Sequence, residues 1–304
     1  MTRVRRTSRA AIIIALTGVL MCGGAVAHAA PQPPWFAMLP PQIQQLLTPP
    51  VPVEKKLATS FAALQKSMRK SLPGKFGVSI APIGGDTPLT FGTLRTGRAW
   101  STLKVPVSLA AQRKNGYRVV QKENKAIMFS DNDAAGDLWG SLGGGRSSVD
   151  AVTTVLREGH DDGTRVSSEA DNPPSYPGYT QWSLADQARF GAHLPCLKDS
   201  EHVIRLMSSV APNQQWGLAK VGRNQGAVTA VKGGWGPATG NSGGYLVRQL
   251  GIITTTRGQV AVAMAAVPKN GSFSTGTAML NRVGDWLGRN LATLPAGKCG
   301  VSVP

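Results

Sequence analysis

The stretch from Ala99 to Val107, with the sequence AWSTLKVPV, places a serine three residues before a lysine. Residues three apart on a helix share a face. We therefore expect Ser101 and Lys104 to lie side by side near a helix start, where Pro106 is tolerated because the first turn has few backbone hydrogen bonds to lose. A serine and a lysine in this arrangement can act as a nucleophile and its base without a histidine.

This spacing is weak evidence by itself, because Ser67 and Lys70 repeat it. Two further motifs follow in order, Ser130-Asp131-Asn132 and Lys232-Gly233-Gly234. Taken singly, the serines are interpretable as helix N-caps and the glycine pair as a turn. The ordered set after an export signal favours a catalytic site.

Together the motifs resemble the S-x-x-K, S-D-N and K-T-G set of penicillin-recognising serine enzymes. Over about residues 54–294 the chain is similar to an actinobacterial member of the serine β-lactamase and penicillin-binding superfamily, nearest to class A. The resemblance implies an α+β fold with an antiparallel sheet flanked by helices. It also implies a reduced helical lobe, because only 29 residues separate Ser101 from Ser130.

The resemblance implies a role for each motif in acylation by a β-lactam or a peptidoglycan stem peptide, without cofactor or metal. Ser101 would attack the carbonyl, and Lys104 would take its proton if burial and nearby Lys232 lower its pKa. Ser130 would pass a proton to the leaving nitrogen. The product of this step is an acyl-enzyme.

The same resemblance assigns the substrate-binding residues. Asn132 would hold a side-chain amide of the substrate, and Lys232 would steer its carboxylate and orient Ser130. Gly233 and Gly234 continue that motif towards Trp235. The backbone N–H groups of Ser101 and Trp235 would form the oxyanion hole.

Two departures from the class A pattern bear on turnover. Gly233 stands where the family usually has threonine or serine, so a hydroxyl for the substrate carboxylate is missing. In the loop 167–179, Glu169 is the first candidate and Asp171 the second for activating the deacylating water, but neither has the family's full local pattern. If neither reaches the site, the acyl-enzyme is long-lived. The alternative is a non-catalytic or slow-turnover penicillin-binding or cell-wall-binding protein on the same fold.

The two ends of the chain predict export. Residues 1–30 combine four arginines, an apolar run of about a dozen residues and a small-x-small site, which is typical of a secretory signal peptide. Arg5-Arg6 fits twin-arginine export poorly, and bulky Met21 disfavours a lipid-modified Cys22. Residues 31–53 hold eight prolines and are predicted to be a linker before a domain over 54–304.

The mature chain is basic and has two cysteines. Without four signal-peptide arginines, 29 of the 33 basic residues face 16 acidic ones, a formal charge of +13. This favours solubility outside the cell or attraction to an anionic cell-wall surface, whereas nucleic acid is disfavoured because no basic cluster is interleaved with aromatics. Cys196 and Cys299 are expected to form a disulfide in an oxidising compartment. The oligomeric state is not determined by the sequence.

Hydrophobic periodicity predicts a helix, a hairpin, a helical middle, three strands and a final helix. The expected ranges are a helix over 54–71, strands over 76–83 and 89–94, a helical middle over 102–215, strands over 227–232, 245–255 and 259–267, and a helix over 276–291. Lys232 is expected to end its strand. The two chain ends would build one antiparallel sheet.

Two competing sites receive less support. The stretch Gly240–Gly244 fits G-x-S-x-G, but no histidine follows Ser242, and only His160 lies far enough upstream for a trypsin-like arrangement. The histidines His160, His193 and His202 have no paired metal-ligand spacing. We predict that they are surface or structural residues.

Overall fold

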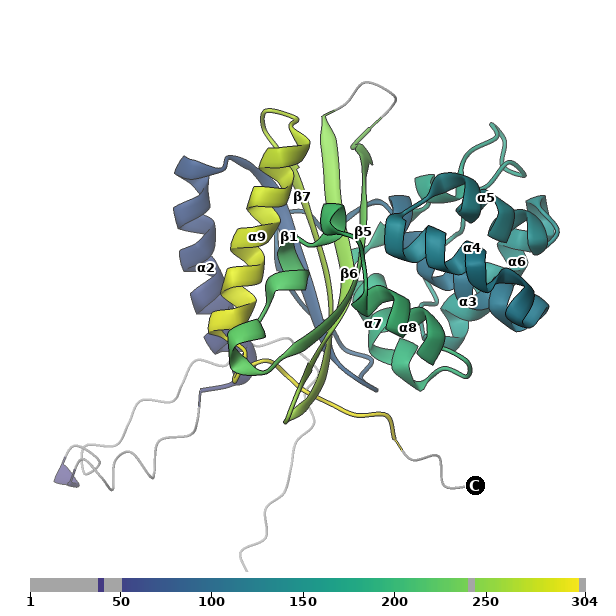
Figure 1. Ribbon diagram of the computed structural model, residues 1–304. Helices are drawn as coiled ribbons and strands as arrows, with labels where there is room; N and C mark the ends of the chain where they lie inside the picture. The colour runs from purple at the N-terminus through teal and green to yellow at the C-terminus, as the bar shows by residue number, and fades with distance from the viewer. Residues whose placement is uncertain (1–37, 41–50, 240–243, 301–304) are drawn as a thin grey trace, which may run out of the picture. The chain divides into compact units, whose positions relative to one another are not determined.

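The computed structural model describes residues 38–40, 51–239 and 244–300. A five-stranded antiparallel sheet runs through the described domain in the order β2-β1-β7-β6-β5 (Figure 1). Its strands are β1 (Gly74–Pro82), β2 (Leu89–Gly92), β5 (Val228–Pro237), β6 (Tyr245–Thr255) and β7 (Gly258–Pro268). A separate pair joins β3 (Thr96–Arg98) to β4 (Gln181–Ser183). The predicted α+β class is confirmed.

Two helices from opposite ends of the chain cover one face of the sheet. These are α2 (Val53–Ser71) and α9 (Phe273–Arg289), which lie side by side in Figure 1. The apolar residues of α2 recur at helical spacing and are buried, among them Phe61. The Phe61 ring meets Trp286 of α9 edge-on at 5.1 Å. The two chain ends therefore share one core, as the pattern predicted.

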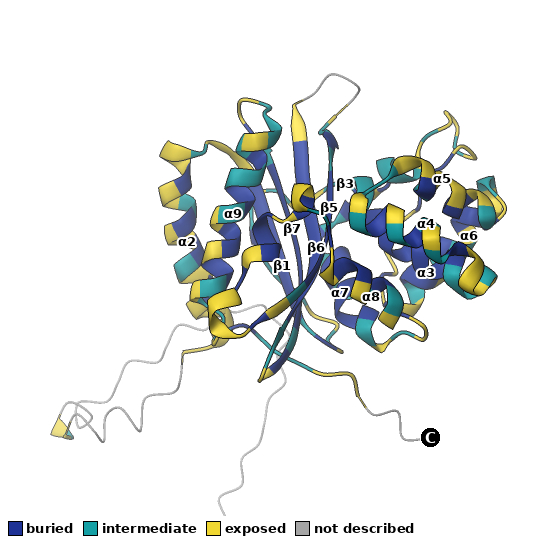
Figure 2. Cartoon of the chain, in the orientation of Figure 1, coloured by how far each residue is buried: buried dark blue, intermediate teal, exposed yellow. Residues whose placement is uncertain are grey.

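The middle of the chain forms a helical lobe on the other side of the sheet. Its helices are α3 (Lys104–Asn115), α4 (Val120–Asn124), α5 (Asn132–Ser141), α6 (Gly145–Glu158), α7 (Leu184–His193) and α8 (Glu201–Ser208). Figure 2 shows buried residues along the strands and exposed ones on the outer helix faces. Residues Lys104 to Ala111 of α3 are all buried, so α3 is the central helix of the lobe and carries Lys104 into it.

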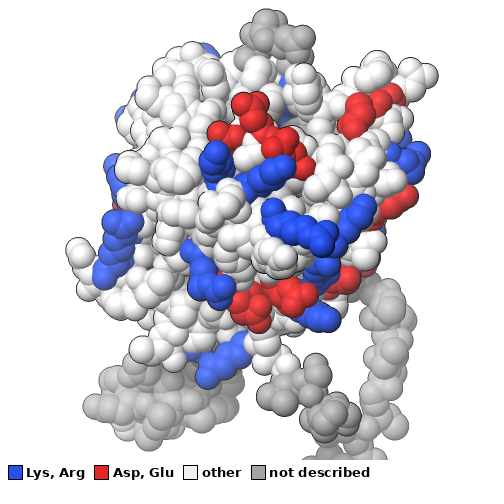
Figure 3. Space-filling model, turned by 45° about the vertical axis from the view of Figure 1, so that its right-hand side comes forward, with Lys and Arg blue, Asp and Glu red and all other residues white. Residues whose placement is uncertain are grey.

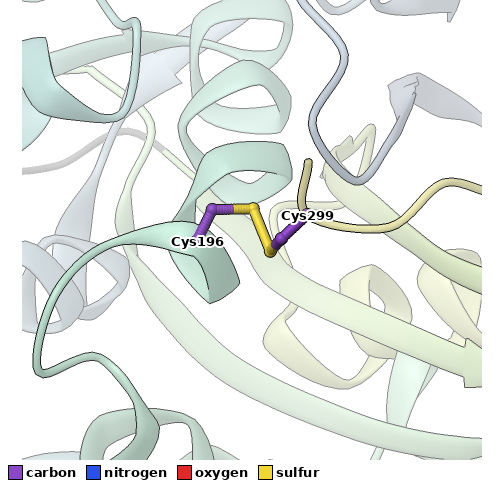
Figure 4. The surroundings of a disulfide bond; sticks show 2 residues. All are labelled: Cys196 and Cys299. Atoms are coloured by element: carbon purple, nitrogen blue, oxygen red, sulfur yellow. A yellow bond between two sulfur atoms is a disulfide. The ribbon is translucent and has the colours of Figure 1, made fainter. Parts of the chain in front are cut away.

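The predicted disulfide is present between Cys196 and Cys299 (Figure 4). Their Cα atoms are 5.4 Å apart, and the bond closes a sequence separation of 103 residues. Cys196 ends the short helix after α7, so the bond ties the C-terminal segment to the helical lobe.

Two local predictions need correction. The strand expected to end at Lys232 continues to Pro237, because residues 228–237 all pair with β6. The helix expected from Ser101 begins at Lys104, since residues Trp100–Leu103 form a 3₁₀ turn.

Several predicted features lie outside the described residues. They are the signal peptide with Cys22, most of the linker over 31–53, and Ser242. Among the residues that the structure describes, no helix combines the length and apolar character that crossing a bilayer requires.

Candidate active site

Ser101 lies on a tight turn that is pressed against β5. The preceding residue, Trp100, has a positive φ of 47°, an unusual conformation for a bulky side chain. A Cβ atom on Gly234 would lie 3.0 Å from Ala99 O, Ser101 N and Thr102 N. Glycine at position 234 therefore lets the strand backbone approach the nucleophile's own backbone, and this contact fixes Ser101 beside β5.

A buried polar chain supports this turn from behind. Thr102 Oγ1 donates to Ala99 O at 2.6 Å and accepts from Gln187 Nε2 at 2.9 Å. Gln187 Oε1 accepts in turn from Arg248 Nη2 at 2.6 Å. Arg248 is fully buried, and burial lowers the pKa of its guanidinium to about 9. Because this chain joins α7 and β6 to the turn, it holds the serine segment in a defined place.

Ser130 and Asn132 converge on Lys104. Ser130 follows a π-helical turn over Lys125–Phe129 and has left-handed φ and ψ of 60° and 27°. Lys104 Nζ donates to Ser130 O at 2.6 Å, to Asp131 O at 3.0 Å and to Asn132 Oδ1 at 2.8 Å. Burial lowers the pKa of Lys104 to about 8, while the charge of Asp131 acts to raise it. The amine is thus within reach of neutrality near physiological pH.

Lys232 approaches the same serine from the sheet. It is fully buried in β5, and its Nζ donates to Ser130 Oγ at 2.9 Å, to Gln214 Oε1 at 2.5 Å and to Gly233 O at 2.9 Å. Burial, and then the charge of Lys104, lower the pKa of Lys232 well below its usual value. Ser130 therefore bridges two buried lysines, through its carbonyl to one and its hydroxyl to the other.

We call Lys104, Ser130, Asn132, Lys232 and Gln214 the lysine–serine network. Its lysines are buried, whereas Ser101 and Ser130 are half-buried and Asn132 is exposed. Within the described residues, Ser101 Oγ has no hydrogen bond to Lys104 Nζ, whose partners are the three oxygens given above. The arrangement places the Ser130 hydroxyl between two buried lysines of lowered pKa, with the half-buried Ser101 three residues before one of them.

Solved structures with a similar architecture include class A β-lactamases. The class A β-lactamase from Mycobacterium abscessus superimposes with a TM-score of 0.59 at 18% identity, covering 77% of this chain and 99% of that one. The β-lactamase from Sphaerobacter thermophilus gives 0.58 at 19% identity, covering 77% and 97%. The chain has the β-lactamase fold. No protein-family model and no curated protein sequence matches it.

Position 233 of this β-lactamase fold has a structural reason to be glycine. A Cβ atom there would lie 3.0 Å from the indole of Trp216 and 3.5 Å from Gln214 Oε1. A threonine or serine would therefore have to displace the Trp216 ring or the Gln214 amide that binds Lys232. Trp235, two residues on, is half-buried and packs on Phe273 at 5.4 Å.

The two acids proposed for deacylation are hydrogen-bonded elsewhere. Glu169 Oε1 accepts from Gly145 N at 2.6 Å and from Trp139 Nε1 at 3.1 Å, so its carboxylate lies at the N-terminus of α6. Asp171 Oδ2 accepts from Ser168 N at 3.0 Å within the loop. In the described part of the chain, neither carboxylate has a hydrogen bond to Ser101 or to the lysine–serine network. The structure thus gives Glu169 a capping role, and its role in deacylation stays a prediction.

Sequence reasoning missed Gln214. Its Oε1 also accepts from Gly233 N at 3.2 Å, and its Nε2 donates to Ile127 O at 3.1 Å and Met128 O at 2.9 Å. It therefore ties the turn before Ser130 to the Lys232 strand. A single glutamine in an irregular segment has no sequence pattern that would reveal this contact.

Proposed function

We propose that this chain is an exported active-site serine enzyme that is acylated at Ser101 by β-lactams or by D-Ala-D-Ala-like peptides. The observation that supports this most strongly is the hydrogen-bonded bridge from Lys104 through Ser130 to Lys232, beside the Ser101 turn. The solved β-lactamases with this fold add support from their printed activity.

The acylation step uses groups that the chain already supplies. Ser101 Oγ bonds to the carbonyl carbon, and its proton passes to neutral Lys104 Nζ, which exchanges one of its three carbonyl partners for the serine. The Ser130 hydroxyl proton goes to the leaving nitrogen as the C–N bond breaks, and Lys232 Nζ, which donates to Ser130 Oγ, supplies the proton that replaces it. The N–H groups of Ser101 and Trp235 would stabilise the oxyanion.

We further propose that deacylation is slow. Glu169 and Asp171 are held by Gly145, Trp139 and Ser168, and the described partners of Lys104 include no carboxylate. A water at the ester would thus lack a strong base. A slow-release penicillin-binding role is favoured over efficient antibiotic hydrolysis.

The test is covalent labelling with a fluorescent penicillin. Wild type should take one equivalent of label that persists for hours, and Ser101→Ala should take none. Ser67→Ala, at the other S-x-x-K spacing, is the matched control and should label normally, as should Ser242→Ala. Absence of label on folded wild type, together with no turnover of a chromogenic lactam, would remove the enzyme and favour a non-catalytic binding protein.

Export and an anionic partner remain part of this proposal. Residues 1–30 would be removed, so the mature N-terminus measured by mass spectrometry should lie after Ala29 or Ala30. On the face drawn in Figure 3, Lys and Arg side chains are interspersed with Asp and Glu. Attraction of the +13 mature chain to a cell-wall polymer would therefore be diffuse, and sedimentation with cell walls should fall steeply as salt is added.

A further inference from the structure

Three side chains that are distant in the sequence meet at one corner of the domain. Asp86 follows β1, His160 follows α6, and His193 is the last residue of α7. Asp86 Oδ1 lies 2.7 Å from His160 Nδ1 and 2.8 Å from His193 Nε2, and the two imidazole rings stack with centroids 3.7 Å apart. We call these residues the His–Asp–His cluster.

We propose that the His–Asp–His cluster is a binding site for one divalent late first-row transition-metal ion, with Zn²⁺ as the expected occupant. The three ligand atoms all lie within 4.8 Å of one another. Around tetrahedral zinc, with bonds of about 2.0–2.2 Å, ligand atoms are about 3.4 Å apart. To accept the ion, the Asp86 Oδ1 distances to His160 Nδ1 and His193 Nε2 would widen by about 0.7 and 0.6 Å, and the two histidine nitrogens, which lie within 4.8 Å of each other, would also settle about 3.4 Å apart.

The exposure of the ligands is suited to this adjustment. The His193 side chain is only 11% exposed and is a fixed anchor, whereas those of His160 and Asp86 are 51% and 63% exposed and can move. Gly84 N donates to Ala192 O at 2.9 Å, which joins the turn after β1 to the end of α7. Two of the three ligands are thus held on segments already hydrogen-bonded to each other.

The chemistry of the ligands selects the kind of ion. Two imidazole nitrogens and one carboxylate suit zinc, copper or nickel, whereas Ca²⁺ and Mg²⁺ favour sets of six or more oxygens. Arg189 Nε donates to the Asp86 backbone carbonyl at 2.9 Å, and its charge opposes a cation. That charge is balanced by Asp186, whose Oδ1 lies 2.6 Å from Arg189 Nη1.

The ion would act as a structural clamp. It would join the turn after β1 to the ends of α6 and α7, close to the disulfide, because Cys196 follows His193 by three residues. Among the described residues, none of the three ligands is hydrogen-bonded to Ser101 or to the lysine–serine network. We therefore expect the metal to raise stability and leave labelling by penicillin unchanged, so this proposal stands or falls independently of the enzyme.

The test is Zn²⁺ titration of the untagged, chelator-treated mature protein by calorimetry, with Co²⁺ absorption as a second measurement. One equivalent should bind, and Zn²⁺ should raise the melting temperature, whereas Mg²⁺ and Ca²⁺ should not. His160→Ala and Asp86→Asn should each weaken binding at least tenfold, in line with the loss of a ligand. His202→Ala, which changes the other histidine of the mature domain, should bind as wild type does.

Two results would overturn the proposal. The first is absence of stoichiometric Zn²⁺ binding to a wild-type protein that still melts cooperatively. The second is binding that His160→Ala leaves unchanged, which would place the ion elsewhere. Because His160 is exposed, its variant is expected to fold, and its melting curve without metal verifies this.

Discussion

Replacing Asp131 by asparagine should shift the pH dependence of acylation at Ser101 to lower pH. Burial lowers the pKa of Lys104 to about 8, and Asp131 is the charge that opposes this shift. With a pKa of about 8, the neutral fraction of Lys104 rises about tenfold from pH 7 to pH 9, and acylation should rise with it. Without the Asp131 charge the pKa falls further, so the rise should begin earlier.

The substitution is chosen to leave the local fold intact. Asp131 Oδ1 caps α5 by accepting from Ala134 N at 2.7 Å, and asparagine is as good an N-cap as aspartate. The carbonyl that accepts from Lys104 is backbone and remains. The change therefore removes a charge and keeps the helix start.

The assay is the rate of fluorescent-penicillin labelling between pH 6 and 10, with Ser101→Ala subtracted as the blank. Wild type should show a midpoint near 8, and Asp131→Asn a lower one with faster labelling at pH 7. A flat profile in both proteins would refute Lys104 as the base. A midpoint that moves upward in the variant would refute the assigned electrostatics.

Three further perturbations test the scaffold. Burial raises the pKa of Glu123 to about 7, above its unfolded value, so its stabilising effect is complete at low pH and is lost as pH rises through 7; in urea melts, Glu123→Gln should gain up to about 3 kcal/mol over wild type between pH 5 and pH 8, and an unchanging difference would contradict this. Removing the disulfide with Cys196→Ser and Cys299→Ser should cost about 2–5 kcal/mol of unfolding free energy in denaturant melts, and an unchanged midpoint would show that the bond does not stabilise the fold. Gly234→Ala would place a Cβ 3.0 Å from three backbone atoms at the Ser101 turn and should slow labelling about a hundredfold, whereas Gly136→Ala, with open space around it, should label normally; equal rates would mean that the strand does not position the serine.

Much of the scaffold could be predicted because local periodicity encodes it. The buried stripe of α2, the long strands β6 and β7 and the amphipathic α9 all follow from spacings of 3.6 or 2 residues. The cysteine pair followed from number and compartment alone. The end of β5 was misplaced, because a glycine-rich run looks like a turn until its pairing with β6 is known.

The candidate site was only half predictable. The order of the three motifs indicated that Lys104, Ser130 and Lys232 would meet, and the hydrogen bonds show that they do. The sequence placed Glu169 as a candidate base, yet its carboxylate caps α6, because the loop's path decides which N–H groups it reaches. The role of Gln214 could not be predicted, since its amide joins Lys232 and Gly233 to backbone carbonyls about 86 residues away, and only folding brings these groups together.

The sequence by itself determined most of the elements, because these depend on neighbours within a turn or two of chain. It also determined the motif order and the pair of cysteines, because these are read directly from the identity and number of the residues. Only the tertiary structure decided the state of the charged groups. Lys232 has a low pKa because folding buries it beside Lys104. His160 and His193 converge on Asp86 because two helix ends meet one turn after β1. Distances between such segments depend on packing, which no local pattern contains.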